Sequence, residues 1–170
     1  MANVIIKSLH AGEKLPLAKD DLIRQVQYVE KKTFPRRDAM DFDTEVHKRN
    51  VDLVIIVDDV GAPDVLTPAR PILVAYMVFA HLKAGKAVLL HKICVSEDYR
   101  RRGIARIVLE TQAERLKKQG CTKIQLWVDE GNMPARILYK VLGFEEVSRV
   151  NDYYAVGRTG IQMLWGFSPV

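Results

Sequence analysis

An apolar strand, a basic loop and a long amphipathic helix follow one another between residues 86 and 120, and this succession constrains the fold more than any other feature. Residues 86–95 form an apolar run of strand length, and the loop at 100–105 reads RRRGIA. The helix is predicted over about 101–119, ended by Gly120, with a buried stripe of Ala105, Leu109, Ala113 and Leu116. A further strand at 123–128 makes the segment a strand–helix–strand crossover.

The remaining elements are predicted from periodicity and from residues that begin or end helices. Strands are predicted over residues 3–8, 51–57, 71–81, 144–149 and 160–165. Helices are predicted from Asp20 or Asp21 to about 32, with Leu22, Val26 and Val29 on one face, over about 43–49, and from the N-cap Asn132 to about 142. This order is a mixed α/β pattern in one domain, without an internal repeat or linker. Segment 58–70 is interpreted as a mobile loop or a contact surface.

The composition describes a globular protein with an excess of positive charge. The chain has 170 residues and a formal net charge of +5, which suits an anionic ligand but is too small to argue for nucleic acid. Cys94 and Cys121 lie in apolar runs, which predicts buried free thiols rather than a disulfide or a zinc site. No signal-peptide pattern and no apolar run of about 20 residues is present, so the expected location is the cytoplasm, or also the nucleus.

The basic loop has the residues of a phosphate-binding site. Amides in the first turn of a helix have no intrahelical partners and lie at the positive end of the helix dipole, so they bind phosphate well. Gly103 lets an anion approach the backbone, and the arginines can add bidentate contacts. A basic helix cap with a solvated face explains the same residues, and runs of arginine also occur in nuclear-import signals. The loop alone leaves these interpretations open.

Two motifs together give the chain a specific resemblance. RRRGIA, residues 100–105, is similar to the Arg/Gln-x-x-Gly-x-Gly/Ala pyrophosphate loop of the GNAT acetyltransferase superfamily. Further along, NMPARILYKVLGFEEV resembles that superfamily's Asn-x-x-Ala-x-x-Leu-Tyr-x-x-x-Gly-Phe segment. The resemblance extends over residues 71–147. It implies the GNAT fold, an α/β (mixed α+β) fold with a central, mostly antiparallel, twisted sheet of about six to seven strands flanked by helices, in which splayed parallel strands hold acetyl-CoA.

The resemblance also divides the chain by role. It implies a single N-acetyltransferase domain over residues 1–170, with the core motifs at 86–147. The acceptor-side segments would be 20–50 and 148–165. A monomer or a homodimer is expected, without a nucleic-acid or membrane partner.

The implied cofactor is acetyl-CoA, without a metal. In such enzymes the strand before the pyrophosphate loop carries the pantetheine, which here points to the backbone of Ile93, Cys94 and Val95. An N–H group there would polarise the thioester carbonyl. Asn132 would contact the pantetheine, or serve only as an N-cap. The pyrophosphate would be bound by the loop residues Arg100, Arg101, Arg102, Gly103, Ile104, Ala105 and Arg106.

The implied reaction is direct attack of a primary amine on the thioester in a ternary complex. Tyr139, which would also contact the cofactor, is the candidate general acid for the leaving thiolate. The frequent acidic or tyrosine position on the preceding strand is Leu89, and the position of a histidine in some relatives is Trp127. His91, on the same strand face as Leu89, is a candidate base, directly or through water, or a structural histidine. A mechanism without a base, in which water removes the proton, is the other interpretation.

Two segments bear on the acetyl acceptor. Phe34 and Pro35 follow the first helix, where such enzymes build one wall of the acceptor groove. Tyr153 and Tyr154 match paired tyrosines that hydrogen-bond the peptide backbone in ribosomal-protein and N-terminal acetyltransferases, or they form an aromatic pair packed on the sheet. The leading prediction is therefore a protein or peptide N-terminal α-amine. The alternatives are a small amine (arylalkylamine, polyamine or amino sugar), a protein lysine, and a non-catalytic acyl-CoA-binding module.

Overall fold

The structure is a computed structural model that describes residues 4–58, 72–83 and 86–167. Its strands are β1 (Val4–Ser8), β2 (Val51–Asp58), β3 (Ile72–His81), β4 (Ala87–Val95), β5 (Lys123–Asp129), β6 (Glu145–Ala155) and β7 (Arg158–Gly166). Its α-helices are α1 (Lys19–Thr33), α2 (Phe42–Glu45), α3 (Ile104–Lys118) and α4 (Met133–Leu142), and two 3₁₀ helices are η1 (Arg36–Asp38) and η2 (Glu97–Tyr99). No α-helix within the described ranges has both the length and the apolar character that a membrane span needs.

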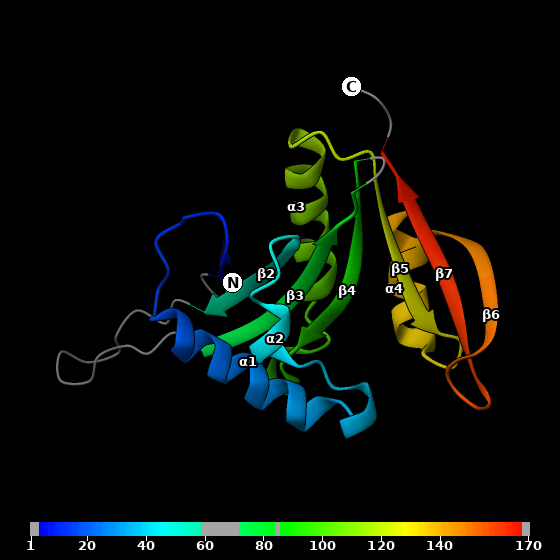
Figure 1. Cartoon of the computed structure of the whole chain (residues 1–170), viewed down its shortest axis with the longest axis horizontal. Helices are drawn as coiled ribbons and strands as arrows, with labels where there is room; N and C mark the ends of the chain where they lie inside the picture. The colour runs from blue at the N-terminus through cyan, green and yellow to red at the C-terminus, as the bar shows by residue number, and fades with distance from the viewer. Residues whose placement is uncertain (1–3, 59–71, 84–85, 168–170) are drawn as a thin grey trace. The chain divides into compact units, whose positions relative to one another are not determined.

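The strands form one seven-stranded sheet in the order β1-β2-β3-β4-β5-β7-β6 (Figure 1). β4 pairs with β5 in parallel, from Ala87 opposite Lys123 to Leu90 opposite Leu126. The pairs β1–β2, β5–β7 and β6–β7 are antiparallel. The predicted mixed, mostly antiparallel sheet is therefore confirmed.

The chain divides into two compact units, and β3, β4 and α3 contribute residues to both. Unit 1 is Met1–Phe79 with Lys92–Ala105, and unit 2 is Ala80–His91 with Arg106–Val170.

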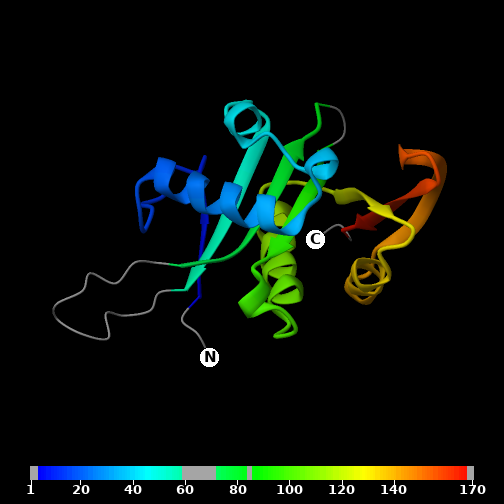
Figure 2. The ribbon, with the colours of Figure 1, turned by 90° about the horizontal axis from the view of Figure 1, so that it is seen from below.

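Unit 1 is built on the apolar strands β2 and β3. Their sequences are nearly continuous in Val, Ile, Leu, Met and Phe, and Leu53 and Val74 are fully buried, as expected for strands covered on both faces. Helix α1 lies across these strands (Figures 1 and 2) and buries Leu22, Ile23 and Val26. These positions recur at helical spacing, so the amphipathic pattern of α1 determines which face packs on the sheet.

Unit 2 combines the long part of α3 with β5, α4, β6 and β7. In α3 the residues Val108, Leu109, Ala113 and Leu116 are buried, whereas Ala105 is half-buried. Buried and half-buried side chains alternate along β5, which is the period of a strand. β6 is the last strand of the sheet, and its side chains from Glu145 to Tyr154 are exposed. Its pairing with β7 shifts register between Glu146 and Ser148 and between Val150 and Ala155.

Several predicted boundaries are wrong. α3 begins at Ile104 rather than near residue 101, because Arg101 and Gly103 have positive φ angles of 63° and 73°, which a right-handed helix does not accommodate. α1 begins at Lys19, and neither Asp20 nor Asp21 is its cap, since the N-cap position is Ala18.

Burial also differs from the predictions in places. Toward the end of α1 the buried residue is Glu30, whereas the predicted Val29 is half-buried. Cys94 and Cys121 are free thiols as predicted, but only Cys94 is buried, and Cys121 is half-buried. The predicted segment 58–70 lies outside the described residues except for Asp58, and so do Asn3 and Pro71 at two predicted strand starts.

Candidate active site

The basic loop leaves β4 through η2 and enters α3 with two left-handed residues. Arg101 has φ 63° and Gly103 has φ 73°, and both are exposed. A left-handed conformation is ordinary for glycine but costs energy in arginine. The first-turn amides of α3, beginning at Ile104, therefore follow a tight, exposed turn, and such amides are available to an anion.

The arginine side chains of the loop hold the loop itself. Arg100 donates from Nε to the carbonyl of Val95 at 3.0 Å, and Arg102 donates to the carbonyl of Asp98 at 2.7 Å. Arg102 also lies over the ring of Tyr99, 5.2 Å from its centroid. Arg100 and Arg102, which were predicted to contact phosphate, thus stabilise the turn that precedes the first amides of α3.

The backbone at Gly103 is open on the side where a side chain would lie. A Cβ added at Gly103 would meet no atom of the described residues within 4 Å, so these residues leave space beside the backbone for a ligand. Among the described residues, no group of three or more His, Cys, Asp or Glu side chains could hold a metal ion.

The predicted cofactor-contacting stretch lies at the end of β4. The parallel pairing with β5 ends at Leu90, and Ile93, Cys94 and Val95 lie beyond it. Cys94 is buried, and burial raises the pKa of its thiol. His91 is exposed, so the candidate base is accessible to solvent, whereas Leu89 and Trp127 carry no titratable group.

Tyr139 is fixed by the way α4 ends. The N–H of Phe144 donates to the carbonyl of Tyr139 at 2.9 Å, the N–H of Gly143 donates to the carbonyl of Lys140 at 3.0 Å, and Gly143 is left-handed with φ 98°. This is a Schellman C-cap, and its accompanying apolar contact joins the rings of Tyr139 and Phe144, whose centroids are 5.4 Å apart. The sequence YKVLGF therefore determines the position of the phenol.

The environment of Tyr139 keeps its hydroxyl protonated. The residue is 7% exposed. Burial raises its pKa to about 12, because the phenolate would lose its hydration.

Asn132 is the N-cap of α4, as predicted. Its Oδ1 accepts a hydrogen bond from the N–H of Ala135 at 3.3 Å, and Pro134 occupies the first turn. The cap uses the carbonyl oxygen of the side chain, and the side-chain NH₂ group at the same exposed site can donate to a ligand.

The predicted acceptor tyrosines belong to an aromatic cluster in unit 2. Tyr153 stacks on Trp127 with centroids 4.2 Å apart, and Tyr154 meets Tyr153 edge-on at 4.9 Å. Both tyrosines lie where β6 departs from regular register. Arg158 lies over Tyr154, 5.3 Å from its ring centroid, and is paired with Asp129 at 2.7 Å. The structure thus brings Tyr153 and Tyr154 together with Trp127, the residue at the position of a possible base.

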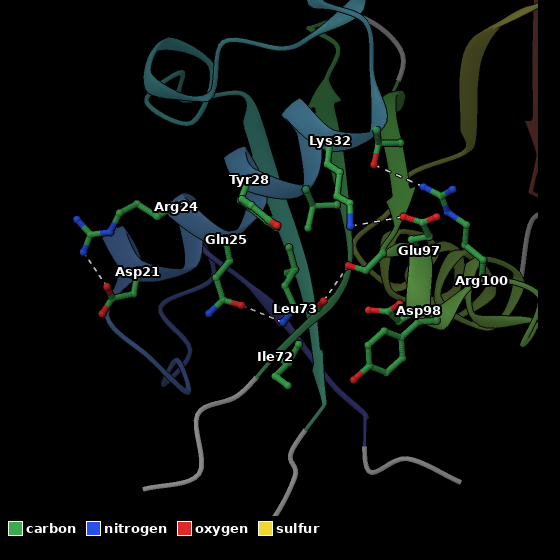
Figure 3. Close-up of a pocket in the computed structure, with 14 residues that line it drawn as sticks. Asp21, Arg24, Gln25, Tyr28, Lys32, Ile72, Leu73, Glu97, Asp98 and Arg100 are labelled. Atoms are coloured by element: carbon green, nitrogen blue, oxygen red, sulfur yellow. Dashed lines mark hydrogen bonds and ion pairs between the residues drawn. The ribbon is translucent and has the colours of Figure 1, made fainter. Parts of the chain in front are cut away.

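Unit 1 contains a groove of about 670 Å³ between α1 and the segment Ser96–Arg100 (Figure 3). Its floor includes Leu73, whose N–H donates to the side chain of Gln25 at 3.0 Å. Acidic and basic side chains on its walls pair with each other, Arg24 with Asp21 and Lys32 with Glu97. Arg100 is the predicted site residue that lines it, so this groove differs from the diphosphate site expected at the start of α3.

The sequence predictions missed a buried polar cluster beside Phe34. Glu30, Tyr76 and Lys92 are joined by hydrogen bonds, and Glu30 is 1% exposed. Two signals in the sequence point to it: Glu30 occupies the apolar stripe of α1, eight residues after Leu22, and Lys92 interrupts the apolar run of β4. Phe34 is half-buried and Pro35 is exposed at the start of η1.

Comparisons with known proteins agree with these features. A statistical model of the family described as "Acetyltransferase (GNAT) family" matches residues 24–144. The ribosomal protein bS18-alanine N-acetyltransferase of Escherichia coli K12 is 38% identical over 65 residues, which are 38% of this chain and 44% of that protein. An N-alpha-acetyltransferase of Saccharolobus solfataricus is 39% identical over 72 residues, which are 42% of this chain and 43% of that protein. These matches span less than half of each relative.

The fold agrees over a longer stretch. The crystal structure of the ribosomal-protein-S18-alanine N-acetyltransferase from Escherichia coli has a TM-score of 0.74 and 22% identity, and the match covers 98% of this chain and 96% of that one. The family match includes the loop at 100–105 and the cap that fixes Tyr139. The chain therefore belongs to the acetyltransferase (GNAT) family.

Proposed function

We propose that the protein transfers the acetyl group of acetyl-CoA to the α-amine at the N-terminus of a protein or peptide. The observation that carries the proposal is the exposed left-handed turn from Arg101 to Gly103 at the start of α3, in a chain of the acetyltransferase (GNAT) family. The amides that follow this turn would hold the diphosphate of the coenzyme.

The coenzyme supplies a thioester, and the chain supplies orientation and hydrogen bonds. A backbone N–H among Ile93, Cys94 and Val95 would donate to the thioester carbonyl and stabilise negative charge there. Tyr139 would donate a hydrogen bond to the sulfur. Since its pKa of about 12 lies above the ordinary thiol value of about 8.5, complete proton transfer to the thiolate is uphill, and the hydrogen bond is its main contribution.

The amine must lose a proton before it attacks. Leu89 and Trp127 cannot accept it, whereas His91 is exposed and can accept it directly or through water. Removal of the proton by bulk water is the alternative route, and it predicts a pH dependence set by the acceptor's own amine.

The preference for a peptide acceptor is supported by the relatives and by the aromatic cluster. Of the two relatives described above, one is named as a ribosomal-protein-alanine N-acetyltransferase and the other as an N-alpha-acetyltransferase. Tyr153 and Tyr154 are 44% and 36% exposed, so part of each side chain is accessible to a ligand. In this proposal their hydroxyl groups would hydrogen-bond the peptide backbone.

A second candidate is a non-catalytic acyl-CoA-binding module. The observation that favours it is the stack of Trp127 on Tyr153, because by resemblance Trp127 stands at the position of a histidine in some N-terminal acetyltransferases and cannot act as a base. Such a module would bind acetyl-CoA and release no thiol with any amine.

An acceptor screen tests the proposal. Thiol release from acetyl-CoA is measured with peptides that begin with Ala, Ser or Met, with the same peptides blocked at the N-terminus, and with spermidine and phenylethylamine. The expected result is turnover with the free peptides and acetylation of the α-amine by mass spectrometry. Preferred turnover of a polyamine, an aromatic amine or the lysine of a blocked peptide would overturn the acceptor assignment, and binding without turnover would establish the module.

A further inference from the structure

We propose that Lys92 and Glu30 are positioning residues that hold the segment 34–40 in the shape of an acceptor wall. The inference rests on the proposed function, since this segment is a wall of the acceptor site only in a transferase. It concerns residues of unit 1 alone.

Glu30 is the centre of the cluster. Its carboxylate accepts hydrogen bonds from the Tyr76 hydroxyl, from Lys92 Nζ and from the N–H of Met40, the last at 2.7 Å. Tyr76 is fully buried, and burial raises the pKa of its phenol, so it remains a donor. The carboxylate therefore connects the interior of β3 with the backbone of the segment after α1.

Lys92 makes a second set of contacts with the same segment. Its Nζ donates to the carbonyl of Asp38 at 2.8 Å and lies 4.0 Å above the centroid of the Phe34 ring. Its side chain is 12% exposed. An ammonium over an aromatic face is attracted by the ring, so Lys92 contacts the segment at Phe34 and again at Asp38.

The charges of Glu30 and Lys92 orient the backbone of the segment more than they stabilise the fold. A buried ion pair adds little net stability compared with an apolar pair of the same size, because both charges lose their hydration. The hydrogen bonds of this pair, however, end on two backbone groups of the segment, Asp38 O and Met40 N. An apolar pair could fill the same volume but could not orient these backbone groups.

The cluster also continues toward the basic loop. The Cys94 thiol lies 3.7 Å from the hydroxyl of Thr33, and Arg100 donates to the same hydroxyl at 3.5 Å. Thr33 is the last residue of α1 and precedes Phe34. The acceptor-side segment and the first residue of the loop motif are thus tied to the same end of α1.

The test compares wild type with the double variant E30Q/K92M, in which both charges are removed and the volumes are kept. The change E30Q keeps an amide oxygen that can accept from the N–H of Met40, and the Tyr76 hydroxyl, which faces the other oxygen of Glu30, can accept from the new NH₂ group. The change K92M removes the donor to Asp38 and the cation over the Phe34 ring. The matched control is K48M, which removes the lysine of the exposed Lys48–Glu45 pair in the same unit. Measurements are the melting temperature, the acetyl-CoA Kd, and KM and kcat for a free-N-terminal peptide.

For E30Q/K92M we expect the acceptor KM to rise about tenfold. A change of this size corresponds to the loss of one charge-assisted hydrogen bond. The acetyl-CoA Kd, the melting temperature and kcat are expected to stay near their wild-type values, and K48M to match wild type throughout. An unchanged KM, or a KM and a Kd that rise together, would overturn the positioning role.

A second readout does not depend on activity. Trypsin can cut after Arg36 and Arg37, which are exposed in η1. At an unchanged melting temperature, E30Q/K92M should be cut there several-fold faster than wild type and K48M, since its segment opens more often. Equal rates would reject the inference. If no amine is a substrate, the proposed function fails, and this readout still decides whether the pair holds the segment.

Discussion

The ring of Tyr153 lies flat on the indole of Trp127, with the two planes inclined by 12° and their centroids 4.2 Å apart. Gly160 makes this stack possible, because it lies in β7 between Asp129 of β5 and Val150 of β6. A Cβ at Gly160 would lie 2.7 Å from Cγ of Tyr153, which is closer than atoms can approach. A glycine without a side chain thus lets a tyrosine of the last strand reach over β7 to a tryptophan of β5.

Replacing Gly160 with alanine should therefore displace Tyr153. We expect G160A to lose about 1–3 kcal/mol of unfolding free energy, as overpacked sites do, and to show a changed near-UV circular dichroism spectrum. The acceptor KM should rise, and the acetyl-CoA Kd should stay the same. The control is G166A in the same strand, where an added Cβ meets no atom of the described part of the chain within 4 Å. If G160A and G166A behave alike, Tyr153 does not depend on this contact.

Gly103 and Gly120 provide a second matched pair. Both have positive φ, 73° and 86°, and at both an added Cβ would meet no atom within 4 Å among the residues that the structure describes. Alanine at either position should cost about 1–2 kcal/mol of stability for the left-handed backbone. Calorimetry with acetyl-CoA should show at least about tenfold weaker binding for G103A, which is about 1.4 kcal/mol, and wild-type binding for G120A. Equal affinity of the two variants would place the diphosphate elsewhere.

Removal of the Tyr139 hydroxyl should affect turnover more than binding. We expect Y139F to lower kcat by about 10²–10³, the usual effect of removing one donor to developing negative charge, with little change in the acetyl-CoA Kd. Y28F is the control, because Tyr28 is 67% exposed and belongs to unit 1. A normal kcat in Y139F would exclude the phenol from the reaction.

The same phenol should make stability depend on pH in the alkaline range. Its pKa is raised by burial to about 12, so the unfolded chain ionises first, near pH 10. The contribution of the neutral Tyr139 phenol to the unfolding free energy is therefore fully present below pH 10. About 3 kcal/mol of it is lost as the pH rises from 10 to 12. The difference in unfolding free energy between wild type and Y139F, measured by urea titration, should fall across this window. A constant difference would show that the phenol is not buried.

Asn132 can be tested for a role beyond its cap. N132A should destabilise α4 by about 1 kcal/mol, whereas N132D keeps an N-cap oxygen and should be close to wild type in stability. If the side-chain NH₂ group contacts the coenzyme, both variants should bind acetyl-CoA more weakly. Wild-type affinity in N132D would mean that Asn132 is a cap alone.

Local signals in the sequence predicted much of this fold, because they act over a few residues. Gly143 ends α4 and Asn132 begins it, as their conformational preferences require. The apolar runs of β2 and β3 are long enough to identify as strands without knowledge of their neighbours.

Features that depend on distant residues were harder to predict. The left-handed conformation of Arg101 could not be predicted from its residue type, since arginine rarely adopts this conformation. Glu30 occupies the apolar stripe of α1, but its partners Tyr76 and Lys92 lie far along the chain, so the sequence alone does not show which groups bind its carboxylate. β6 is longer than predicted. The prediction ended too early because the strand is exposed and lacks the alternation that identifies a half-buried strand.

The exposed strand β6 has a consequence for how the protein behaves at high concentration. The last strand of a sheet presents free backbone groups, to which the edge of another chain can add and start a fibre or precipitate. Here the strand carries charges at Glu145, Glu146, Arg149 and Asp152, and its two register shifts break the straight edge that such addition requires. The chain can thus keep its paired tyrosines on an open edge and still resist self-association.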